Sequence, residues 1–196
     1  DSEKTNKNAL GDMYVKAFRW ASNRIHQEGI VAFVTNNSFL DSLAFDGMRH
    51  HLEQDFSAIY HINLKGNARA TGEQRRREAG NVFNDMIRVG IGITFLVKKA
   101  NHLEKGTQIY IYNIDDYFSS AEKQSVLEEK GTYINVPFQH VPQNPNHIWL
   151  IDGLQKAFAS FLPLATKDSK AGQHSQAIFR LFSNGLQTNR DQWVYD

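Results

Sequence analysis

The residues best suited to chemistry lie in a basic, glycine-containing stretch that leads into an alternating apolar segment. This stretch holds only two carboxylates, Glu73 and Glu78, and it ends at Asn81-Val82-Phe83. Cationic side chains bind phosphates, and an exposed aromatic ring can stack on a base. Phe83 lies among the polar residues Asn81, Asn84 and Asp85, so we expect its ring to be exposed, and it is a candidate base-stacking residue. The candidate phosphate-binding residues are Lys65, Arg69, Arg75, Arg76 and Arg77.

A simpler interpretation of the same stretch stays open. Most aromatic residues pack in cores, so Phe83 would be buried and the arginines would belong to a solvated loop. The basic loop 65–80 contains Gly66, Gly72 and Gly80 and has no large apolar residue, so we expect it to be disordered without bound DNA.

A second candidate is the polar run Thr35-Asn36-Asn37-Ser38, which follows an apolar segment. Open α/β sheets place ligands at the carboxyl ends of their strands, so we expect Asn36 and Asn37 on a functional rim. Turn and cap chemistry favours the same residue types. The pair Gly90 and Gly92 lies inside an alternating strand, where close packing is the better explanation than nucleotide binding.

Metal and nucleophile chemistry find little support. His50 and His51 are adjacent on a predicted helix and point about 100° apart, so they do not form a ligand pair with Glu53. No Gly-x-Ser-x-Gly, His-Glu-x-x-His or phosphate-binding Gly-Lys-Ser/Thr sequence occurs. We expect no metal site.

The periodicity of apolar residues predicts the elements that position these candidates. A helix is expected over 9–28, a strand over 30–34, a helix from 41 to 56, and strands over 58–64 and 87–97. Because the run 30–34 is apolar throughout, we expect a central strand with helices on both sides. The first two strands should be parallel, and the third should return antiparallel beside the second. This is an α/β sheet that ends in an antiparallel hairpin.

The character of the chain changes after Lys99, and we place a domain boundary there, between 1–99 and 100–196. The later part predicts a strand over 108–113 and a polar helix over 119–130 that ends at Gly131. Two further helices are expected, over 150–162 and 173–182. The second part is therefore a mixed α+β segment.

Composition narrows the class of protein. The formal net charge is +1, so only local clustering of charge is informative. The chain has no cysteine, which fits the cytoplasm, and no apolar run approaches the ~20 residues of a membrane span. The chain starts without methionine and ends at Trp193-Val194-Tyr195-Asp196, and we expect it to be a piece of a larger protein.

Taken in order, several segments resemble the C-terminal part of the catalytic domain of N6-adenine-specific DNA methyltransferases. The likeness is to single-polypeptide restriction–modification enzymes (type ISP or IIG-like) that fuse helicase, methylase and specificity regions. It covers residues 9–99 well and the rest in patches. The segments that carry it are Met13–Ala21, Gly29–Leu40, Gly47–Arg49, Ile59–Asn67, Asn81–Phe83 with its strand, and Asn184–Asp191.

The resemblance implies part of a Rossmann-like, S-adenosylmethionine-dependent sheet, followed by the start of a DNA target-recognition region. It implies methyl transfer to an adenine flipped out of double-stranded DNA, with Phe83 stacking on the flipped base. Lys65, Asn67 and the arginines would contact the DNA backbone. The partners implied are the helicase and cofactor-binding half upstream and the specificity domain downstream.

Two family features are missing from the sequence. The catalytic Asn/Asp-Pro-Pro-aromatic loop is absent, and so is the glycine-rich cofactor loop. We therefore expect this piece alone to bind no S-adenosylmethionine and to be inactive. The alternative is a non-catalytic α/β interaction module whose basic loop binds nucleic acid or protein, and a DNA reader that serves specificity alone is a third option.

Overall fold

A computed structural model gives the fold of the chain. It divides into two compact units, residues 1–151 and 152–196, which we describe separately. The structure describes residues 8–84, 86–100, 106–145, 147–150, 161–173 and 176–179.

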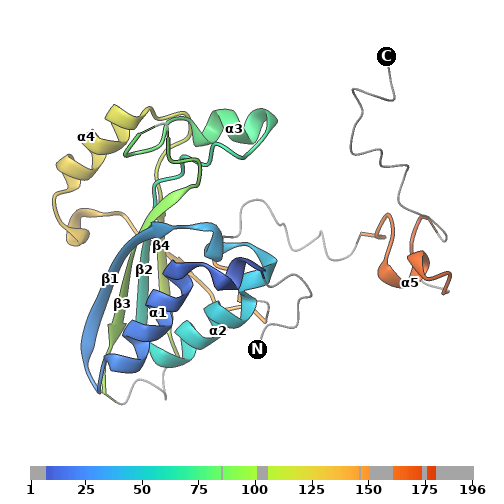
Figure 1. Cartoon of the computed structure of the whole chain (residues 1–196), viewed down its shortest axis with the longest axis horizontal. Coiled ribbons are helices and arrows are strands. Elements are labelled where there is room, and N and C mark those ends of the chain that lie inside the picture. The colour runs from blue at the N-terminus through green and yellow to red at the C-terminus, as the bar shows by residue number, and fades with distance from the viewer. Residues whose placement is uncertain are drawn as a thin grey trace. The chain divides into compact units, whose positions relative to one another are not determined.

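The first unit is built on a five-stranded mixed sheet with the order β1-β3-β2-β4-β5 (Figure 1). β1, β2 and β4 run in one direction, and β3 and β5 run in the other. The strands are β1 (Gly29–Asn36), β2 (Ala58–Asn63), β3 (Ile91–Lys98), β4 (Gln108–Asn113) and β5 (Gln139–Val141).

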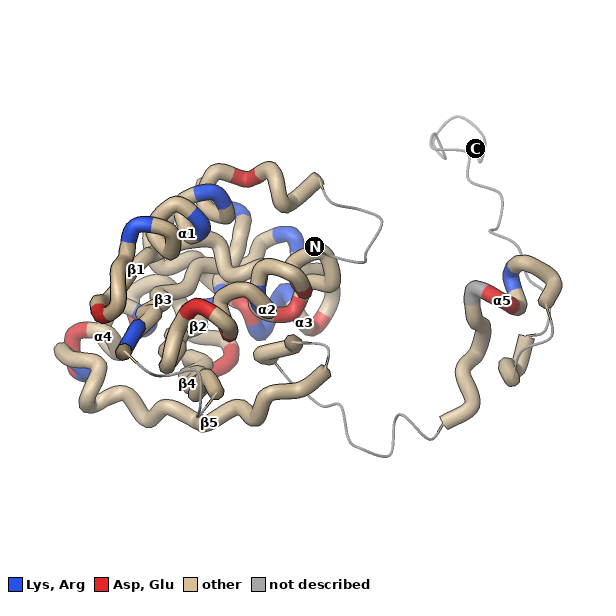
Figure 2. Tube along the Cα trace, turned by 90° about the horizontal axis from the view of Figure 1, so that it is seen from below, with Lys and Arg blue, Asp and Glu red and all other residues tan. Residues whose placement is uncertain are grey.

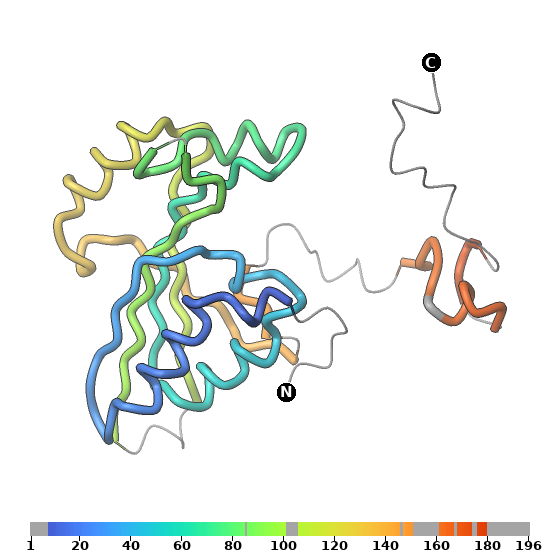
Figure 3. The backbone as a smooth tube through the Cα atoms, in the orientation of Figure 1, coloured from blue at the N-terminus to red at the C-terminus, as the bar shows by residue number. Residues whose placement is uncertain are grey.

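Helices α1 (Met13–Arg24) and α2 (Asp46–Asp55) cover one face of this sheet (Figure 3). Each presents an apolar stripe to the strands, as the 3.6-residue period requires. The side chains between them form the helix-covered core, in which most members are almost completely buried. Its members are Phe18, Phe39, Leu40, Phe45, Leu52, Phe56, Ile59, Leu96, Ile109, Ile111 and Trp149.

Helices α3 (Gly72–Glu78) and α4 (Ser120–Lys130) lie beyond the strands, at the end where β1, β2 and β4 finish (Figure 1). α4 begins with a capping box between Ser119 and Glu122 and ends at Gly131, whose φ is 62°. The helix predicted over 119–130 is thus confirmed. A second apolar cluster lies at this end, with Ile62, Leu64, Val82, Ile91, Ile114 and Val136.

Short 3-10 helices connect several of these elements. They span Asn8–Gly11, Ser38–Leu40, Leu43–Phe45 and Tyr133–Asn135.

The prediction of β1 as a central strand is wrong. β1 lies at the edge of the sheet, where burial alternates along it, and Ile30 and Val34 are 68% and 53% exposed. A short apolar run does not distinguish a strand buried on both faces from an edge strand with one apolar face open.

The predicted direction of the third strand is confirmed, and its expected place at the end of the sheet is wrong. β3 pairs antiparallel with β2 and also with β1, so it lies between two strands that run alike. It begins at Ile91, later than the expected Ile87, and residues 87–90 before it belong to no helix or strand.

The basic stretch is more ordered than its composition suggests. Helix α3 occupies residues 72–78, with Glu73 in its first turn and three arginines in its last, which suits the helix dipole. Glu73 also pairs with Arg76 and Arg77 one turn along. The expectation of a disordered loop missed these local charge pairs.

The compact unit also continues past residue 99. β4 pairs with β2 in parallel, and β5 pairs with β4, so the segment after the expected boundary completes the same sheet. The compact units divide near residue 151. The assignment of 1–99 to a methyltransferase part and of 100–196 to a recognition part stays a prediction.

The second unit contains the short helix α5 (Lys167–Lys170). Ile178 and Phe179 donate backbone hydrogen bonds to Pro163 and Leu164, which joins its two described stretches. The helix expected over 150–162 falls almost entirely outside the described residues. In the helix expected over 173–182, the described residues 176–179 are not helical.

Candidate nucleic-acid interface

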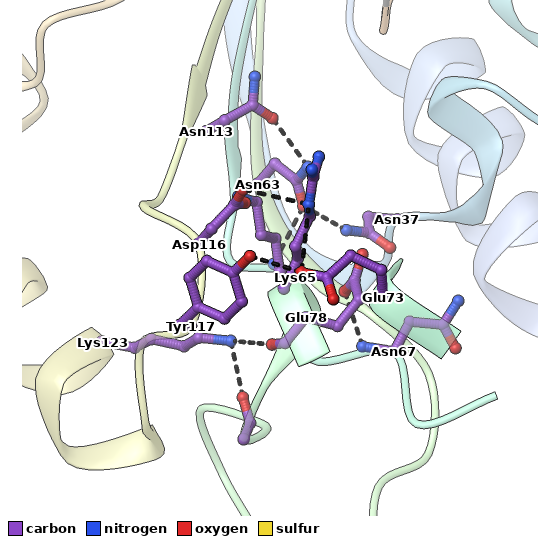
Figure 4. Close-up of polar contacts among 12 residues, drawn as sticks. Asn37, Asn63, Lys65, Asn67, Glu73, Glu78, Asn113, Asp116, Tyr117 and Lys123 are labelled. Carbon is purple, nitrogen blue, oxygen red and sulfur yellow. Dashed lines mark hydrogen bonds and ion pairs between the residues drawn. The ribbon is translucent and has the colours of Figure 1, made fainter. Parts of the chain in front are cut away.

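Three asparagines end the three strands that run in the same direction. β1 ends at Asn36, β2 at Asn63 and β4 at Asn113. The Asn37 side-chain amide donates to Asn63 Oδ1 over 2.5 Å, and the Asn63 amide donates to Asn113 Oδ1 over 2.8 Å (Figure 4). We call Asn37, Asn63 and Asn113 the strand-end rim. A line of amides thus crosses from β1 to β4.

The two glycines that flank Ile91 make room for side chains that cross the sheet. A Cβ on Gly90 would collide with the Asn37 side chain, and one on Gly92 would collide with the imidazole of His61. The close-packing interpretation of this glycine pair is therefore confirmed.

Asn36 itself serves local turn chemistry. Its side-chain oxygen accepts from the Ser38 backbone N–H at 2.8 Å and from the Ser38 hydroxyl at 2.7 Å. Of the two asparagines predicted on the rim, Asn37 joins the amide line and Asn36 forms the turn.

The segment that carries Phe83 lies at this same end of the sheet. Asn81 is 3% exposed, and its amide donates to the carbonyls of Val89 at 3.0 Å and Gly66 at 3.5 Å. Its Oδ1 accepts from the Phe83 N–H at 3.1 Å. Gly66 follows β2 and Val89 precedes β3, so Asn81 joins both ends of the long β2–β3 connection.

Phe83 is 56% exposed, whereas Asn81 and Val82 directly before it are buried. The prediction that Phe83 is exposed is confirmed, and its packing in the core is excluded. The chain therefore holds a large ring in solvent immediately after an anchored pair of residues.

The candidate backbone-contacting residues differ in how available they are. Lys65 is only 15% exposed and forms an ion pair with Asp116, which lowers the pKa of that carboxyl. The Asn67 N–H donates to Glu78 Oε2 at 2.8 Å, and Arg75 donates to the Ala79 carbonyl at 2.7 Å. These three residues shape the connection.

The most exposed cations of the stretch are Arg69, Arg76 and Arg77. Arg76 and Arg77 are 78% and 57% exposed at their side chains, and they pair loosely with Glu73 at 3.5 and 4.0 Å. Long exposed pairs of this kind hold little energy, so the guanidinium groups can exchange them for phosphates. Lys and Arg lie on α1 as well as near α3, so the charge alone does not mark one face (Figure 2).

The contacts that hold α3 come largely from residues after β4, which sequence reasoning missed. The Tyr117 hydroxyl donates to Glu73 Oε1 at 2.6 Å and its backbone N–H to the Arg77 carbonyl at 3.0 Å. Asp116 also lies 3.8 Å from Arg77. The sequence marked this end of the sheet only by an asparagine at or near the end of three predicted strands, namely Asn36, Asn63 and Asn113.

Other kinds of site are not apparent in the described part of the chain. No three histidine or carboxylate side chains gather there as a metal site would require. No helix among the described residues has the length and apolar character needed to cross a bilayer.

Solved structures give the comparison that bears on this geometry. The chain matches DrdV in a complex with DNA at 40% identity and a TM-score of 0.78, over 98% of this chain. It matches the Type ISP restriction–modification enzyme LlaBIII bound to DNA at 35% identity and a TM-score of 0.78, also over 98% of this chain. A nuclease-deletion mutant of the Type ISP enzyme LlaGI, in complex with a DNA substrate mimic, matches at 32% identity and a TM-score of 0.77, over 85% of this chain.

The chain is similar to a segment of DNA-bound Type ISP restriction–modification enzymes. The likeness to this class of enzyme, stated from the sequence, is confirmed at that level. The chain spans 19%, 13% and 12% of DrdV, LlaGI and LlaBIII respectively. No family model matches the sequence, and no curated protein matches it.

Proposed function

We propose that this chain is the DNA-facing part of an N6-adenine methyltransferase within a restriction–modification enzyme. Phe83 would stack on an adenine flipped from double-stranded DNA, and the exposed arginines would contact the backbone. The observation that carries the proposal is the exposed ring of Phe83 on an anchored segment, at the carboxyl ends of the strands. The similarity to enzymes solved with DNA supports it.

The physical logic rests on preorganisation. A flipped base loses its neighbours in the duplex, and an aromatic platform returns about 1–3 kcal/mol of stacking. A ring that already stands in solvent on a fixed backbone loses little entropy when the base arrives. The Asn81 contacts provide that fixed backbone.

S-adenosylmethionine is the methyl donor that the resemblance implies for an intact enzyme. The sequence lacks the glycine-rich cofactor loop of the family, and Gly90 and Gly92 make room for the side chains of Asn37 and His61. The role that we assign to this chain therefore lies on the DNA side of the reaction. The chain alone is proposed to be inactive as a methyltransferase.

The open edge of the sheet suits a piece of a larger protein. Among the described residues no strand pairs with the outer edge of β1, and its side chains Ile30 and Val34 are exposed. Unpaired apolar strands are normally covered in native proteins. We propose that other regions of a longer enzyme, such as the cofactor-binding half, cover this edge.

The test compares two DNA duplexes that differ only in whether one adenine is paired or faces an abasic site. We expect the chain to bind the unpaired adenine more tightly, and Phe83→Ala to reduce that preference about tenfold, within the range of one stacking contact. Phe83→Trp keeps a broad π face and should retain most of it. Fluorescence anisotropy measures both affinities.

The same titration separates the rival function. Changing the exposed Arg69, Arg76 and Arg77 to Ala should flatten the plot of log affinity against log salt by about 0.9 per lost phosphate contact. Arginine dependence without any preference for the unpaired adenine would indicate the non-catalytic module. Absence of DNA binding by the parent chain would contradict both.

A further inference from the structure

Lys123 on α4 is fully buried, although it is a lysine on a helix rich in exposed polar residues. Its ammonium donates to the Glu78 carbonyl at 2.8 Å and to the Gly80 carbonyl at 2.7 Å (Figure 4). A buried ammonium is costly unless it is hydrogen-bonded. Burial lowers the pKa of Lys123 to about 8, and the charge of Glu78 opposes this shift.

The two carbonyls that Lys123 binds flank a strained residue. Ala79 has a φ of 49°, in the left-handed region that residues with a side chain seldom adopt. Its own carbonyl accepts from Arg75 at 2.7 Å. Three successive carbonyls, from residue 78 to residue 80, therefore each bind a cationic side chain.

Two more residues of the same helix face continue this grip toward Phe83. Ser120 lies three residues before Lys123 and four residues before Gln124, so it neighbours both of them on the surface of α4. The Ser120 hydroxyl donates to the Val82 carbonyl at 3.2 Å, and the Gln124 amide donates to the same carbonyl at 2.8 Å. A Cβ on Gly80 would lie 2.9 Å from the Ser120 nitrogen, so the two backbones touch.

Backbone strain concentrates in this part of the molecule. Four described residues other than glycine have a positive φ, and three of them are Lys65, Ala79 and Tyr117. All three belong to the contacts around α3 and the rim. Such conformations cost about 1–3 kcal/mol each and persist where the surroundings fix them.

We infer that Lys123 is a positioning residue, which holds residues 78–82 against α4 so that Phe83 is presented to the base. The inference rests on the proposed function, because it gives Lys123 a role in that same site. It makes α4, which comes after the predicted methyltransferase boundary, a working part of the stacking site. Lys123 itself is buried behind the segment and touches no DNA.

The experiment replaces Lys123 by Met, which keeps the length of the side chain and removes the three donors. Lys130→Met is the matched control, since Lys130 lies on the same helix and its ammonium forms an ion pair with the neighbouring Glu129 at 3.2 Å. Hydrogen exchange of the amides of residues 78–84 is measured by mass spectrometry, with the amides of β2 and β3 as the reference.

Lys123→Met removes both hydrogen bonds of the ammonium, and the loss of one charged hydrogen bond alone corresponds to about tenfold. We therefore expect exchange at residues 78–84 to rise about tenfold or more, with β2 and β3 unchanged. No local rise relative to Lys130→Met would overturn the inference. A rise that is equal in β2 and β3 would also overturn it, because it would mean a general structural role. If Lys123→Met does not fold, Gln124→Ala at the exposed neighbouring position should raise exchange at residues 81–84 alone. No change there would contradict the inference that α4 holds this segment.

A double-mutant cycle then tests whether the contacts of Lys123 affect binding of the unpaired adenine. Where the parent chain prefers the unpaired adenine, Lys123→Met should lose the same preference as Phe83→Ala, and the double variant should lose no more than either. Additive losses would contradict the positioning role. The exchange measurement needs no DNA, so failure of the proposed function leaves the test of Lys123 intact.

Discussion

The helix-covered core and the strand-end rim belong to the same sheet, and they are built from different interactions. The core packs rings and aliphatic chains, as where Phe39 meets Phe18 at 5.4 Å and Trp149 at 5.9 Å between ring centroids. The rim joins amides through hydrogen bonds of 2.5 and 2.8 Å. Apolar packing has no preferred direction, whereas hydrogen bonds fix one, which suits a site that must hold a ring in solvent.

The largest effect should come from removing a buried aromatic ring of the core, in comparison with removing the exposed ring of Phe83 near the rim. Phe39 is completely buried and Phe83 is 56% exposed. Phe39→Ala should lower the free energy of unfolding by about 3–5 kcal/mol, because it leaves a cavity. Phe83→Ala should change it by no more than about 0.5 kcal/mol. Urea denaturation measures both, and a large loss for Phe83→Ala would argue that its ring supports the fold.

The next effect tests whether the rim is a connected structure. Asn63 accepts from the Asn37 amide and the Lys65 N–H, and it donates to Asn113. Asn63→Ala leaves buried polar groups unpaired and should cost about 3 kcal/mol. Asn135→Ala is the control, since that exposed amide makes a single bond to the Lys130 carbonyl. Equal losses of melting temperature would mean that the amide line adds nothing.

A titratable residue, His61, is buried beside the helix-covered core, and it gives a pH dependence. His61 is fully buried, its Nδ1 lies 2.9 Å from Thr94 Oγ1, and Nε2 has no hydrogen-bond partner among the described residues. Burial lowers the pKa of His61 from 6.5 to about 3. Between these two pKa values the unfolded chain binds a proton at His61 and the folded chain does not. The free energy of unfolding is therefore unaffected by His61 above pH 6.5 and decreases as the pH falls toward 3.

Between pH 7 and pH 5 this loss should reach about 2 kcal/mol. Replacing the pair by apolar residues of similar size, His61→Leu with Thr94→Val, should remove that part of the acid sensitivity. Thermal melting at the two pH values measures it. A variant that loses as much stability on acidification as the parent would assign the dependence to the carboxylates.

The sequence predicted the core better than the rim, for a physical reason. Phe18, Leu52 and Ile59 recur at helix or strand periods, and period reports burial directly. The bonds from Asn37 to Asn63 and from Lys123 to Gly80 join residues 26 and 43 positions apart. Such contacts follow from strand order, and the order β1-β3-β2 was itself not predicted.

Contacts between residues distant in the sequence also decide which of the candidate cations are available to bind phosphate. A cluster of arginines was visible in the sequence, but the division of labour among them was not. Arg75 holds the Ala79 carbonyl and Lys65 binds Asp116, while Arg76 stands in solvent. These contacts depend on the formation of α3 and on residues after β4, and no local sequence pattern predicts them. Exposure of Phe83 was predicted because polar residues surround it in the sequence.

The smallest effect on stability concerns the open face of β1. Ile30 and Val34 point away from the helix-covered core, while Val31 between them packs against it. Changing Ile30 and Val34 to Thr keeps strand propensity and removes only exposed methyl groups, so we expect each change to alter the free energy of unfolding by less than about 0.5 kcal/mol. Val31→Thr is the control and should cost more, because its hydroxyl would be partly buried.

The informative measurement on these variants is self-association. An unpaired apolar strand is a template for pairing, so the parent chain should associate at high concentration and the double variant should associate less. Sedimentation velocity compares the two. A double variant that melts as far below the parent as Val31→Thr does would show that Ile30 and Val34 are already packed within the chain. Unchanged stability with weaker association would identify this face of β1 as the surface through which copies of the chain associate.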